Sequence, residues 1–139
     1  MAAAAGAPGE SIEVVADGKK FDLHLGGSAK VIVYVGHDGL MDFQLTSLPV
    51  KHDDEQRDAI ILACASKNYF AAPLRATGAR PLLWTTNLMA PEAYTLAAAI
   101  DGWLNHERDE QIRVRAAKAY GQYQRIGFKS ADKLFATGW

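Results

Sequence analysis

The chain has 139 residues, a formal net charge of −1 and a single cysteine, Cys64. This length suits one domain with a hydrophobic core, and one cysteine excludes an internal disulfide. The near-neutral charge and the absence of any apolar stretch approaching the roughly 18 residues of a membrane helix predict neither nucleic acid nor membrane as a partner.

The opening segment, residues 1–10, is rich in alanine and glycine and has no positively charged start, so it is not typical of a signal peptide. Two interpretations stay open: a disordered start, or the tail of an element whose beginning is missing. If the chain is complete, the lack of a signal peptide predicts a soluble cytoplasmic protein. Residues 11–139 are expected to form one domain.

A β-hairpin is predicted over Ser11–Leu25, because two alternating segments flank the tight-turn dipeptide Asp17-Gly18. The segment Lys30–Val35 is apolar without alternation, which predicts a strand covered on both faces. A polar loop is expected to follow over Leu40–Asp58, and a second buried strand over Ala59–Cys64.

The second half alternates between helix and strand patterns. A helix is predicted up to Thr77, closed by Gly78, and apolar residues at helical spacing predict further helices later in the chain. The expected elements are a helix at 69–77, a strand at 80–86, helices at 91–104 and 109–125, and a last short helix capped by Ser130 that carries Leu134 and Phe135. This order predicts an α/β three-layer sandwich with a mostly parallel central sheet, plus the N-terminal hairpin.

Two reactive side chains follow the two apolar strands. His37 lies in Gly36-His37-Asp38-Gly39, directly after the first strand, and Cys64 lies in Ala63-Cys64-Ala65-Ser66, at the end of the second. The carboxyl edge of a parallel sheet is where ligands and catalytic groups gather. If the two strands are neighbours, the cysteine lies near an imidazole, which is the minimum needed for thiolate chemistry.

These two motifs resemble those of the caspase-like cysteine peptidases, a group that includes caspases, legumain, gingipain, clostripain and separase. Their signature is a strand ending in His-Gly and a later strand ending in Ala-Cys-x-Ser or Ala-Cys-x-Gly. The resemblance covers Lys30–Thr86, and the order of histidine before cysteine is the same. The present chain departs from the pattern because Asp38 separates His37 from Gly39. Strands that precede the histidine strand in such domains have no counterpart here.

The resemblance implies a peptidase with a Cys-His dyad, acting on a peptide or protein through a thioester and without a cofactor. Cys64 would be the nucleophile and His37 the general acid and base. Backbone N–H groups at Cys64 and at the Asp38–Gly39 turn would form the oxyanion hole. The remaining candidates, all expected to contact the substrate, are Asp42, Ser66, Trp84, Thr85, Thr86 and Asn87.

The same residues are less compatible with other classes of protein. His37-Asp38 is also the core dipeptide of HD-type metal phosphohydrolases, but the other three histidines are scattered over a hairpin, a loop and a helix end. No zinc-site spacing and no phosphate-binding glycine loop occurs. The main alternative is a non-catalytic caspase-like or generic α/β interaction domain, with Cys64 buried and His37 structural. The oligomeric state is not predicted.

Overall fold

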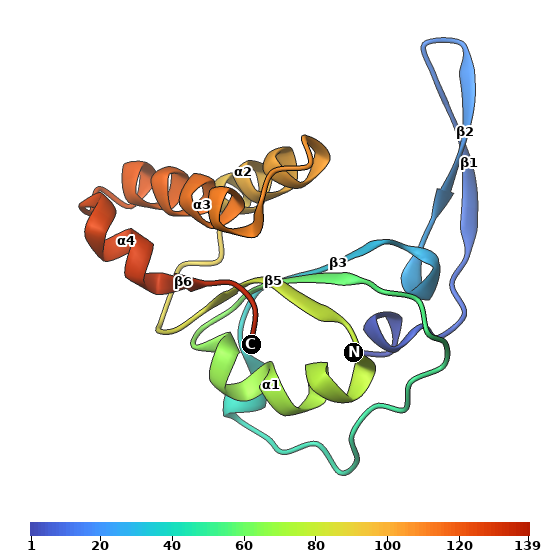
Figure 1. Ribbon diagram of the computed structural model, residues 1–139, viewed down its shortest axis with the longest axis horizontal. Helices are drawn as coiled ribbons and strands as arrows, with labels where there is room; N and C mark the ends of the chain where they lie inside the picture. The colour runs from blue at the N-terminus through green and yellow to red at the C-terminus, as the bar shows by residue number, and fades with distance from the viewer.

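The computed structural model describes all residues from Met1 to Trp139 and contains two separate sheets (Figure 1). In the larger sheet the strand order is β3-β4-β5-β6, with β3, β4 and β5 parallel and β6 antiparallel to β5. The smaller sheet is the predicted hairpin of β1 and β2. The strands are β1 Ser11–Ala16, β2 Lys19–His24, β3 Val31–Val35, β4 Asp58–Leu62, β5 Arg80–Thr85 and β6 Phe135–Ala136.

Helices cover both faces of the larger sheet, which confirms the α/β class with a mostly parallel sheet. Helix α1 (Ser66–Thr77) lies on one face, whereas α2, α3 and α4 lie on the other (Figure 1). Their bounds are α2 Ala93–Leu104, α3 Asp109–Tyr123 and α4 Phe128–Leu134. None of these helices has the length and apolar character that crossing a membrane requires.

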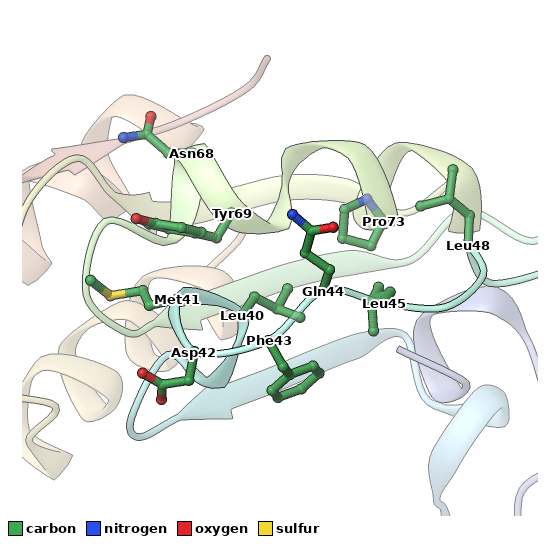
Figure 2. A pocket seen from close by; sticks show the side chains of 10 residues that line it. All are labelled: Leu40, Met41, Asp42, Phe43, Gln44, Leu45, Leu48, Asn68, Tyr69 and Pro73. Atoms are coloured by element: carbon green, nitrogen blue, oxygen red, sulfur yellow. The ribbon is translucent and has the colours of Figure 1, made fainter.

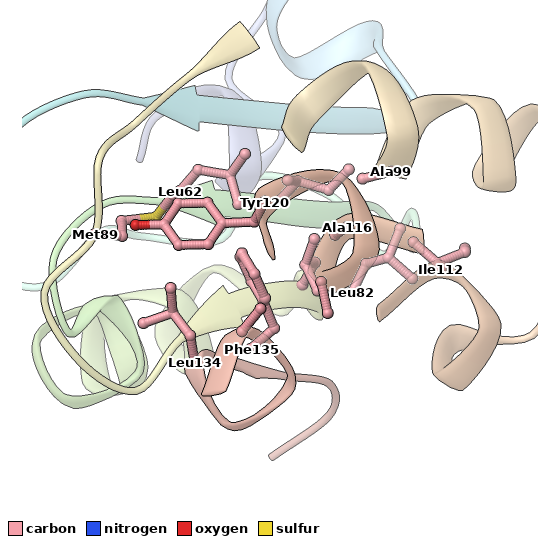
Figure 3. Packing of buried hydrophobic residues seen from close by; sticks show 13 residues of the cluster. Leu62, Leu82, Met89, Ala99, Ile112, Ala116, Tyr120, Leu134 and Phe135 are labelled. Carbon is pink, nitrogen blue, oxygen red and sulfur yellow. The ribbon is translucent and has the colours of Figure 1, made fainter. Parts of the chain in front are cut away.

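The packing of β4 explains why its sequence is apolar from Ala59 to Leu62. Ile60 and Leu62 point toward α2, α3 and α4, whereas Ala59 and Ile61 belong to the cluster on the α1 side. A strand covered on both faces buries both sets of alternating side chains. Figure 3 shows the larger cluster, in which Leu62 lies beside side chains from α3 and from the end of the chain.

Strand β3 differs from its prediction, because it is the outer strand of the sheet and only β4 pairs with it. Its side chains are half-buried or exposed, with Val33 at 38% and Tyr34 at 43% exposure. Both faces of β3 are only partly covered: Val31 and Val35 pack against the cluster under α2, α3 and α4, and Ile32 packs against the cluster on the α1 side. An apolar sequence indicates a strand, but it does not indicate whether that strand pairs with a neighbouring strand on each side.

Several other boundaries also differ from the predictions. Residues Ala3–Ala5 form a short 3₁₀ turn whose Ala4 packs against the α1 side of the sheet, so residues 1–10 are not a featureless segment. Helix α1 begins three residues earlier than expected, at Ser66. Helix α4 starts after Gly127, so Ser130 lies inside it, and Phe135 belongs to β6 and pairs with Thr85.

Replacement of Leu62 by alanine is expected to lower the free energy of unfolding by about 2–5 kcal/mol, because it leaves a cavity in the packed cluster. Leu88→Ala is the matched control, since Leu88 is exposed and its truncation leaves no cavity. Urea denaturation followed by circular dichroism measures both. Equal losses in the two variants would contradict the packing described.

Candidate functional site

The parallel pairing of β3 and β4 brings the two predicted reactive residues to one edge of the sheet. Val35 lies opposite Leu62, and the N–H of Gly36 donates to the carbonyl oxygen of Leu62 at 3.1 Å. His37 follows Gly36, and Cys64 follows Leu62 by two residues. The backbone at both residues therefore leaves the same carboxyl edge, as the sequence predicted.

Cys64 is half-buried and its sulfur lies between the backbone groups of Met89. The thiol donates to the Met89 carbonyl oxygen at 3.6 Å, and the Met89 N–H donates to the sulfur at 3.5 Å. The N–H group of Cys64 itself donates to no carbonyl oxygen. One backbone N–H group, that of Met89, therefore faces the sulfur.

The residue after Cys64 has a backbone conformation that L-amino acids seldom adopt. Ala65 has a φ of 47°, in the left-handed region, and caps the N-terminus of α1. Such a conformation costs of the order of 1–2 kcal/mol for a residue with a Cβ, and it persists only where surrounding contacts enforce it. One such contact is the N–H of Ala65, which donates to the carbonyl oxygen of Asn87 at 2.9 Å.

A buried pair of hydroxyl groups holds this turn. The Ser66 hydroxyl donates to the Ile61 carbonyl oxygen at 2.8 Å, and the Thr85 N–H donates to the Ser66 hydroxyl at 3.0 Å. The Ser66 N–H in turn donates to the Thr85 hydroxyl, which donates to the carbonyl oxygen of Ala63. Both side chains are fully buried. They cannot contact a substrate in this conformation, and we assign them the role of positioning Cys64.

His37 is exposed and its ring is oriented by a carboxylate. Its Nε2 atom lies 2.5 Å from Oδ2 of Asp42, and its carbonyl oxygen accepts hydrogen bonds from the Tyr34 hydroxyl at 2.6 Å and the Gly39 N–H at 3.1 Å. The ring makes no hydrogen bond to the Cys64 sulfur. The Gly39 N–H, expected in the oxyanion hole, instead closes the turn after His37.

Asp38 is fully buried beneath this turn, although it lies next to an exposed histidine. Its Oδ1 accepts a hydrogen bond from the Leu40 N–H at 3.0 Å, so it caps the short 3₁₀ turn Gly39–Met41. Its Oδ2 has no partner. Burial raises the pKa of this carboxyl above 3.8, against the opposing effects of the Leu40 N–H and of His37. Asp38 therefore shapes the loop that carries His37 and Asp42.

A groove of about 590 Å³ lies between this loop and α1 (Figure 2). Its walls are mostly apolar, and Asp42, the only charged residue among them, connects it to the His37 ring. The amides of Gln44 and Asn68 and the hydroxyl of Tyr69 are the other polar side-chain groups. The lining residues are Leu40, Met41, Asp42, Phe43, Gln44, Leu45, Leu48, Asn68, Tyr69 and Pro73.

The remaining predicted residues divide into buried and exposed ones. Trp84 is buried, lies edge-on to Trp139 with ring centroids 5.5 Å apart, and cannot contact a substrate in this conformation. Thr86 and Asn87 are exposed and line a second cavity of about 320 Å³ with residues of α3 and α4. The Thr86 hydroxyl is already bonded to the Lys133 carbonyl oxygen at 2.7 Å.

The sequence interpretation missed the groove and the contact of Met89 with the sulfur. One signal for the groove was present: Met41, Phe43 and Leu45 place apolar side chains at every second position of a polar loop, and all three are exposed. No local pattern marks Met89, since its N–H reaches the sulfur only through the folding of the 86–90 loop.

Comparisons of the chain with protein-family models, with curated proteins and with solved structures found no match in any of the three. The caspase-like resemblance therefore rests on the two motifs and on their arrangement at the sheet edge.

The burial of Asp38 predicts a pH-dependent effect on stability. Because its pKa is raised in the folded protein, its favourable contribution is present below its ordinary value of 3.8 and is lost as the pH rises through the raised value. Asp38→Asn removes the buried charge and keeps an oxygen for the Leu40 N–H. The stability of this variant relative to the unmodified protein should therefore increase between about pH 3 and pH 7.

Denaturation midpoints across this pH range measure the effect. Asp22→Asn is the control for the same substitution at an exposed position, since Asp22 lies on the exposed hairpin. A change with pH for Asp38→Asn no larger than that for Asp22→Asn would contradict the burial of the charge.

Proposed function

We propose that the protein is a cysteine-dependent hydrolase of caspase-like architecture that cleaves peptide bonds with Cys64 and His37. The observation that carries the proposal is the pairing of β3 with β4, which puts both residues at the same carboxyl edge of the sheet. The Ala65 conformation supports it, because backbone strain is concentrated at functional sites.

The reaction begins when the Nδ1 atom of His37 takes the thiol proton and the Cys64 sulfur attacks the carbonyl carbon of the scissile bond. A carbon–sulfur bond forms and the carbonyl oxygen becomes an oxyanion. As the carbon–nitrogen bond breaks, His37 gives its proton to the leaving amine, and a thioester remains. Water then attacks the thioester with His37 as base, releasing a carboxylic acid and the free thiol.

Three groups around the dyad support these steps. The Cys64 N–H, which has no carbonyl partner, is the candidate donor to the oxyanion. The Met89 N–H lies 3.5 Å from the sulfur and donates a hydrogen bond to it. Asp42 holds the Nε2 side of the His37 ring, which leaves Nδ1 for proton transfer.

The His37 ring and the Cys64 sulfur make no direct hydrogen bond to each other. Catalytic hydrogen bonds in unliganded enzymes are often long or poorly aligned and tighten only in the complex. The groove beside Asp42 suits apolar side chains of an extended peptide, and the Gln44 and Asn68 amides suit its backbone. Thr86 and Asn87, which line the cavity beside α3 and α4, stay as candidate contacts.

A non-catalytic interaction domain is the second candidate function, and one observation favours it. The Cys64 thiol is bonded on both sides by Met89, and the His37 ring is bonded to Asp42 rather than to the sulfur. In that case the groove would bind a partner peptide without cleaving it.

The test is incubation with a library of fluorogenic peptides and with a peptidyl acyloxymethyl ketone, which alkylates an attacking thiolate. The unmodified protein is expected to hydrolyse a subset of peptides and to become labelled at Cys64. Cys64→Ser and His37→Asn should each reduce hydrolysis by about 10²-fold or more, since both lack a group that takes part in bond making or proton transfer.

His52→Asn is the matched control for His37→Asn, because His52 lies in a loop remote in sequence from both motifs and should leave hydrolysis unchanged. Absence of hydrolysis with binding of peptides retained in Cys64→Ser would favour the interaction domain. Hydrolysis that survives in Cys64→Ser would overturn the proposed nucleophile.

A further inference from the structure

The β1–β2 hairpin has one apolar face. Residues that lie opposite each other on paired strands point to the same side, and the register pairs Ile12 with Leu23 and Val14 with Phe21. These four side chains therefore share a face. The pairing continues one step further, since the N–H of Leu25 donates to the Glu10 carbonyl oxygen at 2.7 Å.

The other face of the hairpin is polar and internally bonded. Lys20 forms an ion pair with Glu13 at 3.0 Å, and the Ser11 hydroxyl lies 2.9 Å from Nδ1 of His24. Val15 is the one large apolar residue on this side. Alternation between an apolar and a polar face is typical of a sheet that packs on one side only.

Nothing in the chain covers the apolar face. The hairpin extends away from the body of the molecule (Figure 1), and Ile12, Phe21 and Leu23 are 44%, 47% and 46% exposed. An isolated two-stranded hairpin is marginally stable in water, and it becomes stable when its apolar face packs against another surface.

We propose that two copies of the chain associate by packing these apolar faces against each other across a two-fold axis. The charges at the two ends of the face support a second copy as the occupant. Glu10 lies at the base of this face and Lys19 at its tip, because Lys19 pairs with Ala16 and Glu10 pairs with Leu25. Antiparallel stacking places the Lys19 of one copy over the Glu10 of the other, twice in each dimer.

The available area sets the strength of this contact. The accessible parts of Ile12, Val14, Phe21, Leu23 and Leu25 offer roughly 400 Å² in each copy, so the dimer buries about 800 Å². Interfaces below about 1,200 Å² are weak or transient. The proposal is therefore a reversible dimer with a four-stranded sandwich at its centre, in which the two hairpins are about 10 Å apart.

Sedimentation velocity at protein concentrations from about 1 to 200 μM tests the proposal, because mass action makes a weak dimer depend on concentration. The unmodified protein should shift from monomer to dimer over this range. Phe21→Glu with Leu23→Glu should remain monomeric throughout. Val15→Glu, on the polar face, is the matched control and should dimerise as the unmodified protein does.

A charge exchange keeps the test valid if the glutamates disrupt the hairpin itself. Glu10→Lys or Lys19→Glu alone should weaken dimerisation by about three- to tenfold, and the two together should restore it. A monomer at all concentrations would overturn the proposal, as would a dimer that survives in the Phe21→Glu, Leu23→Glu variant or single charge changes without effect.

Discussion

The position of Cys64 depends on one buried interaction, the reciprocal hydrogen bonding of Ser66 and Thr85. Each residue donates its backbone N–H to the other's hydroxyl, and the two hydroxyls are bonded in turn to carbonyl oxygens of Ile61 and Ala63. This pair fastens the end of β4, the start of α1 and the end of β5 to one another. Because the groups are fully buried, leaving any of them unpaired would cost about 1–3 kcal/mol.

That constraint fixes Cys64, the proposed nucleophile, whereas His37 is exposed and held by fewer contacts. Hydrogen bonds join the turn at Ala65 to Asn87 and the Cys64 sulfur to Met89, so Cys64 is held in place by the 86–90 loop. His37 is exposed and depends on Asp42, at the end of a short turn that buried Asp38 caps. A firmly held thiol and an exposed imidazole at the same sheet edge agree with the proposed dyad. The ring and the sulfur make no direct hydrogen bond, since the ring is bonded to Asp42 and the sulfur to Met89.

Much of the fold could be predicted from the sequence, and the reasons for the misses are physical. The hairpin, the β3–β4 pair and the helical faces carry strong local patterns, and the structure contains them. The unpaired edge of β3 and the two-residue strand β6 depend on which distant segments of the chain pair with the sheet. A local sequence pattern carries no information about such pairing. The motifs located Cys64 and His37 correctly at one edge. They did not reveal that Ser66, Trp84 and Thr85 are buried, since polar and aromatic residues at a strand end look alike whether they bind a ligand or support the turn.

We propose that His37 takes the proton of the Cys64 thiol at this edge of the sheet. The most direct test is the rate at which iodoacetamide alkylates Cys64, the only thiol of the chain. This small reagent requires no substrate specificity. The account predicts that the folded protein reacts at Cys64 near neutral pH and that His37→Asn slows the reaction several-fold, with the fold preserved by circular dichroism. A thiol that reacts only after denaturation, or equal rates in the two proteins, would contradict it.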